Sequence, residues 1–284
     1  MTAIIVTTLQ EAIRKRTFIV MGIVSLLYLV FWTIMLNYFP NSSVTHGMGQ
    51  EQFRPFAMQM VTRMGFQFSS MLIALLTIML GSGAIASELE SGLIHGILAR
   101  PIQRYEYILG KLFGLVILAS LYATVLFALI LAIGSFYGLD TILSLTFAQI
   151  LKGWLLYLLI PVALLCLTVY GSVSLKAVAN GIAVIFIYIL GNVGGMVEMI
   201  GGYLNSDSII STGIFISLIS PFQTIYTSME RVMVPNSQLA GSAMSAASLS
   251  GSGQPASTWM FLYIALYMLT FVALATWKFS KKDI

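Results

Sequence analysis

The chain has 284 residues, of which 58% are hydrophobic and only 8% are charged, and its formal net charge is +4. Soluble domains carry about 25% charged residues and about 45–50% apolar ones, so this composition excludes an ordinary soluble domain. The small positive charge is scattered along the sequence and does not indicate a nucleic-acid partner. We therefore interpret residues 1–284 as a single integral membrane domain.

Residues 1–16 differ from the apolar runs that follow them. Ile5, Leu9 and Ile13 lie at helical spacing on one face, whereas Arg14 stands at the basic end of the segment. A helix of this kind lies in the headgroup layer, where its basic end meets anionic lipid. We expect an amphipathic interfacial helix over residues 1–16.

Long runs without Asp, Glu, Lys or Arg recur along the rest of the chain. A bilayer core about 30 Å thick needs roughly 20 apolar residues for each helical crossing. Each charge left at a helix centre costs about 2.5–3.5 kcal/mol. The sequence therefore predicts an all-α fold with six transmembrane helices. Their expected ranges are 17–38, 66–86, 107–134, 149–172, 178–201 and 258–277.

The lysines and arginines between these helices fall mainly on one side. With a cytoplasmic amino terminus, the inner side holds Arg14, Lys15, Arg16, Arg100, Arg104, Lys111, Lys176, Lys278, Lys281 and Lys282, and the outer side holds Arg54, Arg63, Lys152 and Arg231. Loops that stay inside carry the excess of Lys and Arg. We expect both termini in the cytoplasm and a location in the plasma membrane.

The polar segment 87–106, between the second and third helices, contains a short predicted helix. Ser87, followed three residues later by Glu90, fits the pattern of a capping box. Pro101 ends the helix, because its ring cannot follow in a regular helix without a clash. A short helix flanked by charges at the membrane face suits contact with another protein. The alternative is an ordinary loop whose charges only set the topology.

Polar residues inside the predicted helices are candidates for a functional path, because they are costly in lipid. Asn192 lies near the middle of the fifth helix and Glu198 lies toward its outer end. The alternatives are a bond from Asn192 to a neighbouring helix and a solvated Glu198. The spacing of Gly191 and Gly195 allows another helix to approach closely. The path candidates are Gln67, Thr77, Tyr188, Asn192 and Glu198.

The segment 203–257 is expected to form an external loop. Its residues 208–220 are apolar, but this stretch is shorter than the roughly 20 residues that a crossing needs, and Pro221 follows. We expect a short re-entrant or interfacial helix there, not a seventh crossing. The Ser/Ala/Gly-rich stretch 236–257 is expected to be a flexible tether, and a substrate-capturing lid is the alternative.

The sequence lacks the common catalytic motifs. It has no G-x-x-x-x-G-K-S/T stretch, so we do not expect it to hydrolyse ATP. His46 and His95 are not spaced as in H-E-x-x-H, and Cys166 is the only cysteine, so no metal site is predicted. Methionines near His46 are ligand types for Cu(I), but methionine also fills gaps on apolar surfaces. We interpret the chain as non-enzymatic, with no cofactor of its own.

Several patches resemble ABC-2-type transporter permeases. The glutamates of SELESG, the stretch ARPIQR and the pair Gly110–Lys111 are similar to the family's segment between the second and third helices. The start TLQEAIRKRTF resembles its elbow helix, and the end ATWKFSKKDI resembles its exit sequence. SPFQTIY resembles an Asn-Pro-containing stretch, with Ser220 in place of the Asn. In size and layout the chain also resembles the permeases of nitrous-oxide-reductase maturation and of antibiotic export.

The resemblance implies a function and partners. In that family the segment between the second and third helices is a coupling helix that docks on a separate cytosolic ATPase, where ATP and Mg bind. The residues carried over to this role are Glu88, Glu90, Gly92, His95, Arg100, Pro101, Arg104 and Lys111. The family also implies a second permease copy, a path along the second and fifth helices, and export. The alternatives are a scaffold or sensor subunit that transports nothing, and an ion-driven carrier, which usually needs ionisable groups at mid-membrane.

Overall fold

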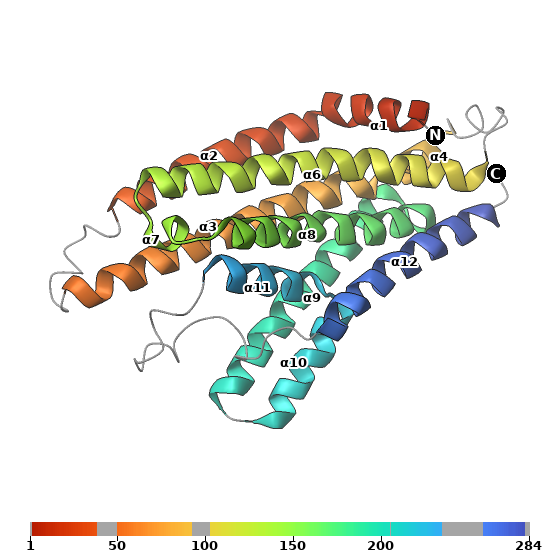
Figure 1. The fold of residues 1–284 in the computed structure, drawn as a ribbon. Coiled ribbons are helices and arrows are strands. Elements are labelled where there is room, and N and C mark those ends of the chain that lie inside the picture. The colour runs from red at the N-terminus through yellow and green to blue at the C-terminus, as the bar shows by residue number, and fades with distance from the viewer. Residues whose placement is uncertain (1, 39–49, 93–102, 205, 235–257, 282–284) are drawn as a thin grey trace.

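The computed structural model describes residues 2–38, 50–92, 103–204, 206–234 and 258–281, and within these ranges the regular elements are all helices (Figure 1). In chain order they are α1 (Thr2–Arg14), α2 (Arg16–Tyr38), α3 (Gln50–Ser82), α4 (Ala86–Glu90), α6 (Arg104–Phe136), α7 (Asp140–Leu143), α8 (Phe147–Ser174), α9 (Ala177–Tyr203), α10 (Asp207–Ile219), α11 (Phe222–Met233) and α12 (Thr258–Ser280).

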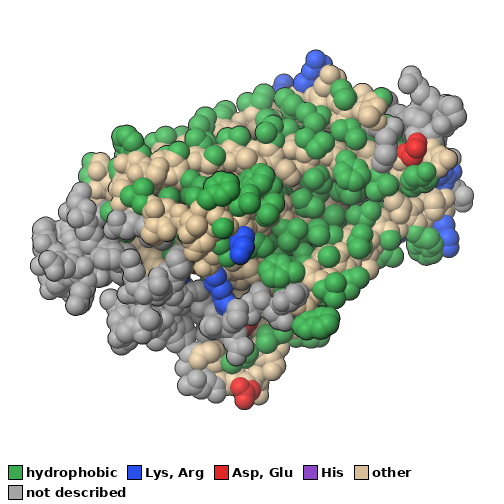
Figure 2. All heavy atoms as spheres, viewed as in Figure 1, with side chains coloured by type: hydrophobic (Ala, Val, Ile, Leu, Met, Phe, Trp, Pro, Cys, Tyr) green, Lys and Arg blue, Asp and Glu red, His purple; other side chains and the backbone are tan. Residues whose placement is uncertain are grey.

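Six helical segments are long and apolar enough to cross a bilayer. They are α2, the segment Met58–Glu90 formed by α3 with α4, α6, α8, α9 and α12. The first and last helices bring the two chain ends to the same end of the bundle, beside α4 (Figure 1). Hydrophobic side chains are spread along the described part of the face shown in Figure 2, and few charged ones lie among them. The predicted all-α integral membrane fold with six transmembrane helices is confirmed.

Helix α8 lies at the centre of the bundle, in contact with α3, α6, α9, α11 and α12. Tyr157 is fully buried there, and its hydroxyl donates to Ser69 Oγ of α3 at 2.6 Å. Phe127 of α6 packs against Tyr157 and Phe66, with ring centroids 5.3 and 5.8 Å apart. Pro161 lies inside α8. Because proline has no amide hydrogen, the carbonyl of Tyr157 lacks its usual donor four residues later.

Helix α3 begins well before residue 66, where the sequence predicted its start. Two aromatic side chains of α2 hold this extension: Trp32 Nε1 donates to the Val61 carbonyl at 3.0 Å, and the Tyr28 hydroxyl donates to the Gly65 carbonyl at 2.6 Å. A Cβ at Gly65 would lie only 2.7 Å from the Trp32 ring, so glycine permits this approach. The predicted boundary at residue 66 is wrong, and packing against α2 holds residues 61–65 as part of the helix.

Helices α9 and α10 form a tight antiparallel hairpin, and the chain bends by 105° between α10 and α11. A Cβ at Gly191 would meet Ser220 Oγ at 2.4 Å, and one at Gly213 would meet the Glu198 backbone at 2.6 Å. The α9 glycines are therefore approached from within the same chain, by α10 at Gly194 and by Gln223 of α11 at Gly195. Helix α10 occupies the stretch where a short helix was predicted. Helix α11, which lies against α8, was not predicted.

Helix α1 packs along α6. A Cβ at Gly110 of α6 would lie 2.9 Å from Ile4, and one at Gly114 would lie 3.0 Å from Thr8. Thr8 is buried in this contact, whereas Arg14 is exposed. The face of α1 expected to contact lipid is thus covered in part by α6. An interfacial position for the exposed basic end stays a prediction.

Candidate functional site

Helix α4 is a five-residue helix whose amino end is capped by another helix. The backbone amides of Ile85 and Ala86 both donate to Ser172 Oγ of α8, at 2.9 and 2.8 Å. Ser87 lies inside α4, where its hydroxyl donates to the Gly83 carbonyl. The predicted capping box of Ser87 and Glu90 is therefore wrong. The helix begins two residues earlier than a Ser87 cap would place it, and α8 supplies the capping oxygen from a distant part of the sequence.

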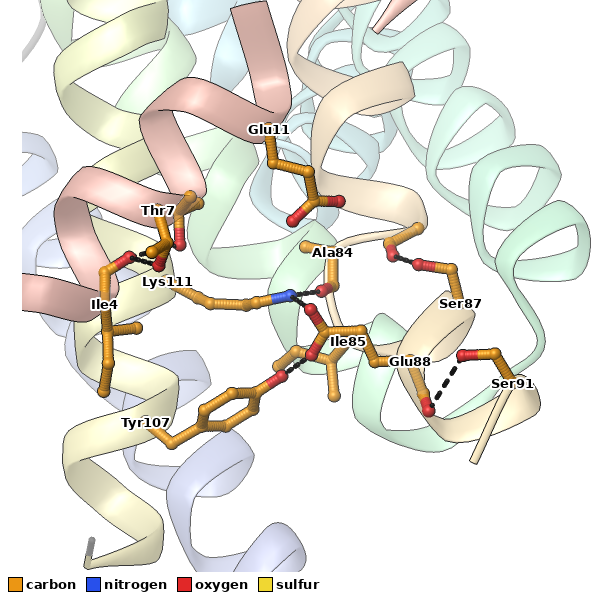
Figure 3. Close-up of polar contacts among 12 residues, drawn as sticks. Ile4, Thr7, Glu11, Ala84, Ile85, Ser87, Glu88, Ser91, Tyr107 and Lys111 are labelled. Atoms are coloured by element: carbon orange, nitrogen blue, oxygen red, sulfur yellow. Dashed lines mark hydrogen bonds and ion pairs between the residues drawn. The ribbon is translucent and has the colours of Figure 1, made fainter. Parts of the chain in front are cut away.

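Four residues form a buried polar cluster beside α4, which we call the α4 cluster: Ala84, Glu88, Tyr107 and Lys111 (Figure 3). The Lys111 ammonium of α6 donates to Glu88 Oε1 and to the Ala84 carbonyl, and the Tyr107 hydroxyl donates to Glu88 Oε2. The side chains of Lys111 and Glu88 are only 6% and 13% exposed. Both oxygens of the carboxylate thus have a donor, as a buried charge requires.

The α4 cluster is joined to the last helix and to the first. The Tyr107 ring stacks on Phe279 of α12, with centroids 5.7 Å apart, and Arg104 Nη1 donates to the Ser280 carbonyl at 2.9 Å. In Figure 3, Glu11 of α1 extends toward Lys111. The start of α6 thereby connects α4 with α1 and α12.

The end of α4 contacts the start of α9. Glu90 Oε1 accepts a hydrogen bond from the Ala177 amide at 3.1 Å. A carboxylate at the first turn of a helix is favourable, because the helix dipole is positive there. Gly92 follows with φ +74°, a conformation that residues with a side chain rarely adopt. Three helices of the bundle, α6, α8 and α9, therefore hold the four-residue stretch 87–90 together with the turn before it.

A second buried ion pair lies at the opposite end of α3, and we call it the α11 pair: Arg63 and Glu230. Arg63 Nε lies 3.3 Å from Glu230 Oε1, and their side chains are 15% and 10% exposed. The Tyr226 hydroxyl of α11 donates to the Arg63 carbonyl at 3.3 Å. Burial raises the pKa of Glu230, while Arg63 and Arg231 act in the opposite direction.

The amino-acid sequence matches a known family over almost its whole length. Residues 2–284 match the family described as ABC-2 family transporter protein. The chain belongs to the ABC-2 transporter family. A search of curated proteins finds no match. The predicted resemblance is confirmed at this level, whereas the nitrous-oxide-reductase and antibiotic-export subgroup stays a prediction.

Membership of the ABC-2 family defines the general role of the chain. It is a permease component of an ABC transporter, in a family that is generally non-catalytic and associates with an ABC ATPase subunit. The predicted multi-pass membrane location agrees with the six apolar helices.

The residues predicted to couple this ABC-2 permease to its ATPase fall into three groups. Glu88 and Lys111 bond to each other inside the α4 cluster. Glu90 bonds to α9, and Arg104 bonds to α12. Gly92 is exposed at the end of α4, and His95, Arg100 and Pro101 lie outside the described residues. The structure therefore brings Glu88 and Lys111 together, but it buries them where a docking surface would need them exposed.

Two of the five predicted path residues, Thr77 and Asn192, bond within their own helices. Thr77 is fully buried, and its hydroxyl donates to the Ile73 carbonyl at 2.6 Å. Asn192 Nδ2 donates to the Tyr188 carbonyl one turn earlier, at 3.0 Å. Gln67 on α3 is half-buried. Thr77 thus faces packed protein in this conformation, and the role of these residues in a path stays a prediction.

Glu198, the fifth path candidate, lies on α9 where that helix meets α10. Its backbone is close to Gly213, and its side chain is partly buried. This position is at the far end of the α9–α10 hairpin from α4 (Figure 1). Glu198 is therefore part of the hairpin contact in this structure.

Sequence reasoning missed three residues that organise the α4 end. Ser172 caps α4, and Phe279 stacks on Tyr107. Asn180 is 1% exposed, and its Nδ2 donates to the Thr168 carbonyl at 2.8 Å and to the Ser82 carbonyl at 3.2 Å. The sequence alone could have singled out Asn180, because a side-chain amide in the first turns of an apolar helix is costly in lipid unless it has hydrogen-bond partners.

Proposed function

We propose that this chain is the membrane-spanning subunit of an ABC exporter in the plasma membrane, driven by a separate cytosolic ATPase that binds ATP and Mg. The observation that carries the proposal is the anchoring of α4. The stretch just before residues 93–102 is hydrogen-bonded to three helices. Glu88 bonds to α6, the amides of Ile85 and Ala86 donate to Ser172 of α8, and Glu90 bonds to α9. A force on the following segment would reach three membrane helices.

The distribution of basic residues supports a cytoplasmic position for the α4 end and for both termini. At this end lie the described residues Arg104, Lys111, Lys176, Lys278 and Lys281, whereas the basic end of α1 lies further along α6, next to Phe18, which packs on Tyr122. At the opposite end lie Arg63, Lys152 and Arg231. Segments that remain in the cytoplasm carry the excess of Lys and Arg.

In this proposal the ATPase contacts residues 93–102, and its ATP-driven closure pushes on them. The push tilts α3, α6 and α9 and opens the path to the outside. A second copy of the chain completes the path, with Gln67 on α3 and Asn192 on α9 as its polar contributions. Export as the direction follows from the family resemblance.

Site-specific photo-crosslinking tests the proposal. A crosslinking amino acid is placed at residue 95 or residue 100 of the full chain, and a control is placed at Lys152, at the opposite end of the bundle. We expect a nucleotide-hydrolysing protein to be captured from native membranes at 95 and 100 and not at 152. Capture of proteins without ATPase activity would support the scaffold alternative. No capture with intact expression would remove the proposal.

A further inference from the structure

The charged groups of the α4 cluster are more buried than the residues of a docking surface would be. Lys111 is 5% exposed as a whole residue, and its ammonium is surrounded by the Glu88 carboxylate, the Ala84 carbonyl and the Tyr107 ring, whose centroid lies 5.6 Å away. A partner protein on the surface would meet little of either charged group. The function of this ion pair must therefore be sought inside the chain.

The position of the cluster in the fold explains what it can do. Helix α3 ends at Ser82 and α4 begins at Ala86, so only a short turn that includes Gly83 connects them. A five-residue helix after such a turn has little contact area of its own to fix its direction. Lys111 bonds to the turn at Ala84 and to α4 at Glu88, and so fixes both to α6.

We propose that Glu88, Tyr107 and Lys111 are positioning residues that make α4 and α6 move as one body, and that they do not themselves contact the ATPase. This inference rests on the proposed function. Residues 93–102 connect α4 to α6 directly. With the cluster intact, displacement of that segment moves α3 and α6 together. Without it, α4 keeps its bonds to α8 and α9 through Ser172 and Glu90 but is no longer fixed to α6, so displacement of the segment reaches α6 less directly.

A purely structural role makes a different prediction, and a double substitution separates the two. Removing one member of a buried pair leaves the other charge unpaired and destabilises the fold, whereas removing both charges is often neutral. The variant Glu88→Gln with Lys111→Met therefore keeps the fold. If the pair only balances charge, the double variant behaves like the wild type. If the pair transmits movement, the variant assembles normally but does not respond to ATP.

Tyr107→Phe is a second and milder variant. It keeps the ring that stacks on Phe279 and removes only the hydroxyl that donates to Glu88. Lys152→Met is the matched control, because it removes an exposed lysine at the opposite end of the bundle. These three variants are compared in the full chain, purified together with its ATPase.

The readout is the movement of the membrane helices. A cysteine replaces the buried Thr77, Cys166 is changed to Ser, and the rate of maleimide labelling is measured with and without ATP, Mg and vanadate. We expect vanadate-trapped ATP to raise the labelling rate in the wild type and in Lys152→Met. In the double variant we expect that rise to shrink by about fivefold or more, the lower range of ordinary coupling between sites. A smaller loss is expected for Tyr107→Phe, with normal ATPase binding and basal hydrolysis in both.

Three results would overturn the inference. One is a wild-type response in both the double variant and Tyr107→Phe. Another is loss of ATPase binding in either variant, which would make these residues part of the contact surface. The third is failure of the unsubstituted chain to bind any ATPase. That result would remove the proposed function as well, and the unsubstituted chain reveals it without any variant.

Discussion

The two buried ion pairs among the described residues lie at opposite ends of the same membrane segment, Met58–Glu90, but they are built differently. The Glu88–Lys111 pair has a second donor, Tyr107, on the carboxylate and an additional acceptor, Ala84, on the ammonium. Arg63 and Glu230 face each other at 3.3 Å.

The difference indicates what each pair holds in place. The α4 cluster fixes a five-residue helix that has few contacts of its own. The α11 pair joins α3 to a helix that is already buried along one face through Ile225, Met229 and Met233. We therefore expect the α4 cluster to matter more for the position of its helix than the α11 pair does, and the consequences of breaking each pair should differ accordingly.

The largest effect is expected for Lys111→Met. It leaves the Glu88 carboxylate buried with Tyr107 as its donor, and loss of one partner of a buried pair costs about 3–5 kcal/mol. Thermal unfolding in detergent measures the loss. The double variant with Glu88→Gln should recover most of the stability. A single variant as stable as the wild type would show that water reaches the site freely.

A smaller effect is expected for Arg63→Met. Glu230 is 10% exposed, and burial already favours its protonated form, so the carboxyl group can take up a proton when its partner is lost. We expect a destabilisation of about 1–3 kcal/mol, in the range for a lost charged hydrogen bond. The same thermal unfolding assay compares it directly with Lys111→Met. A loss larger than that of Lys111→Met would reverse the order of the two pairs.

A third variant, Ser172→Ala, tests the placement of α4 without touching a charge. It leaves the amides of Ile85 and Ala86 without their shared acceptor. Loss of a helix cap typically costs about 1 kcal/mol. Hydrogen exchange of these two amides should become faster while exchange in the middle of α8 is unchanged. Unaltered exchange at both amides would mean that another group caps α4.

The smallest effect is expected from pH acting on the α11 pair. A carboxyl group whose pKa rises on folding stabilises the fold most below the ordinary glutamate pKa of about 4.3. That contribution is lost as the pH rises through the raised value. The stability of the wild type relative to Glu230→Gln should therefore decline from acidic pH toward neutral pH. A pH-independent difference between their unfolding midpoints, with Lys152→Gln as the control, would contradict this.

The sequence predicted the membrane helices well because each depends on local composition. The run 107–134 lies inside α6, and 149–172 lies inside α8, since bilayer thickness sets the length of an apolar helix. The prediction failed at the start of α3. The residues of α3 just before 66 are held by Trp32 and Tyr28 of α2, and a local pattern does not contain these contacts.

The candidate site was predicted in part. Glu88 and Lys111 were selected from a family resemblance as residues that couple the chain to an ATPase, and the structure pairs them with each other. Their separation along the chain gives no helical or strand spacing from which a contact could be inferred. Ser172 is still further from α4 in sequence, so its capping bond depends wholly on how α8 packs.

Pro161 has a consequence for how the two ends communicate. Helix α8 touches both regions, through Ser172 at α4 and through Gly153, where a Cβ would lie 2.3 Å from the sulfur of Met233 in α11. The missing amide at Pro161 lies between these two contacts. Helix α8 can therefore bend at Pro161 without losing a further backbone hydrogen bond. One end of the helix can rearrange while the other keeps its packing.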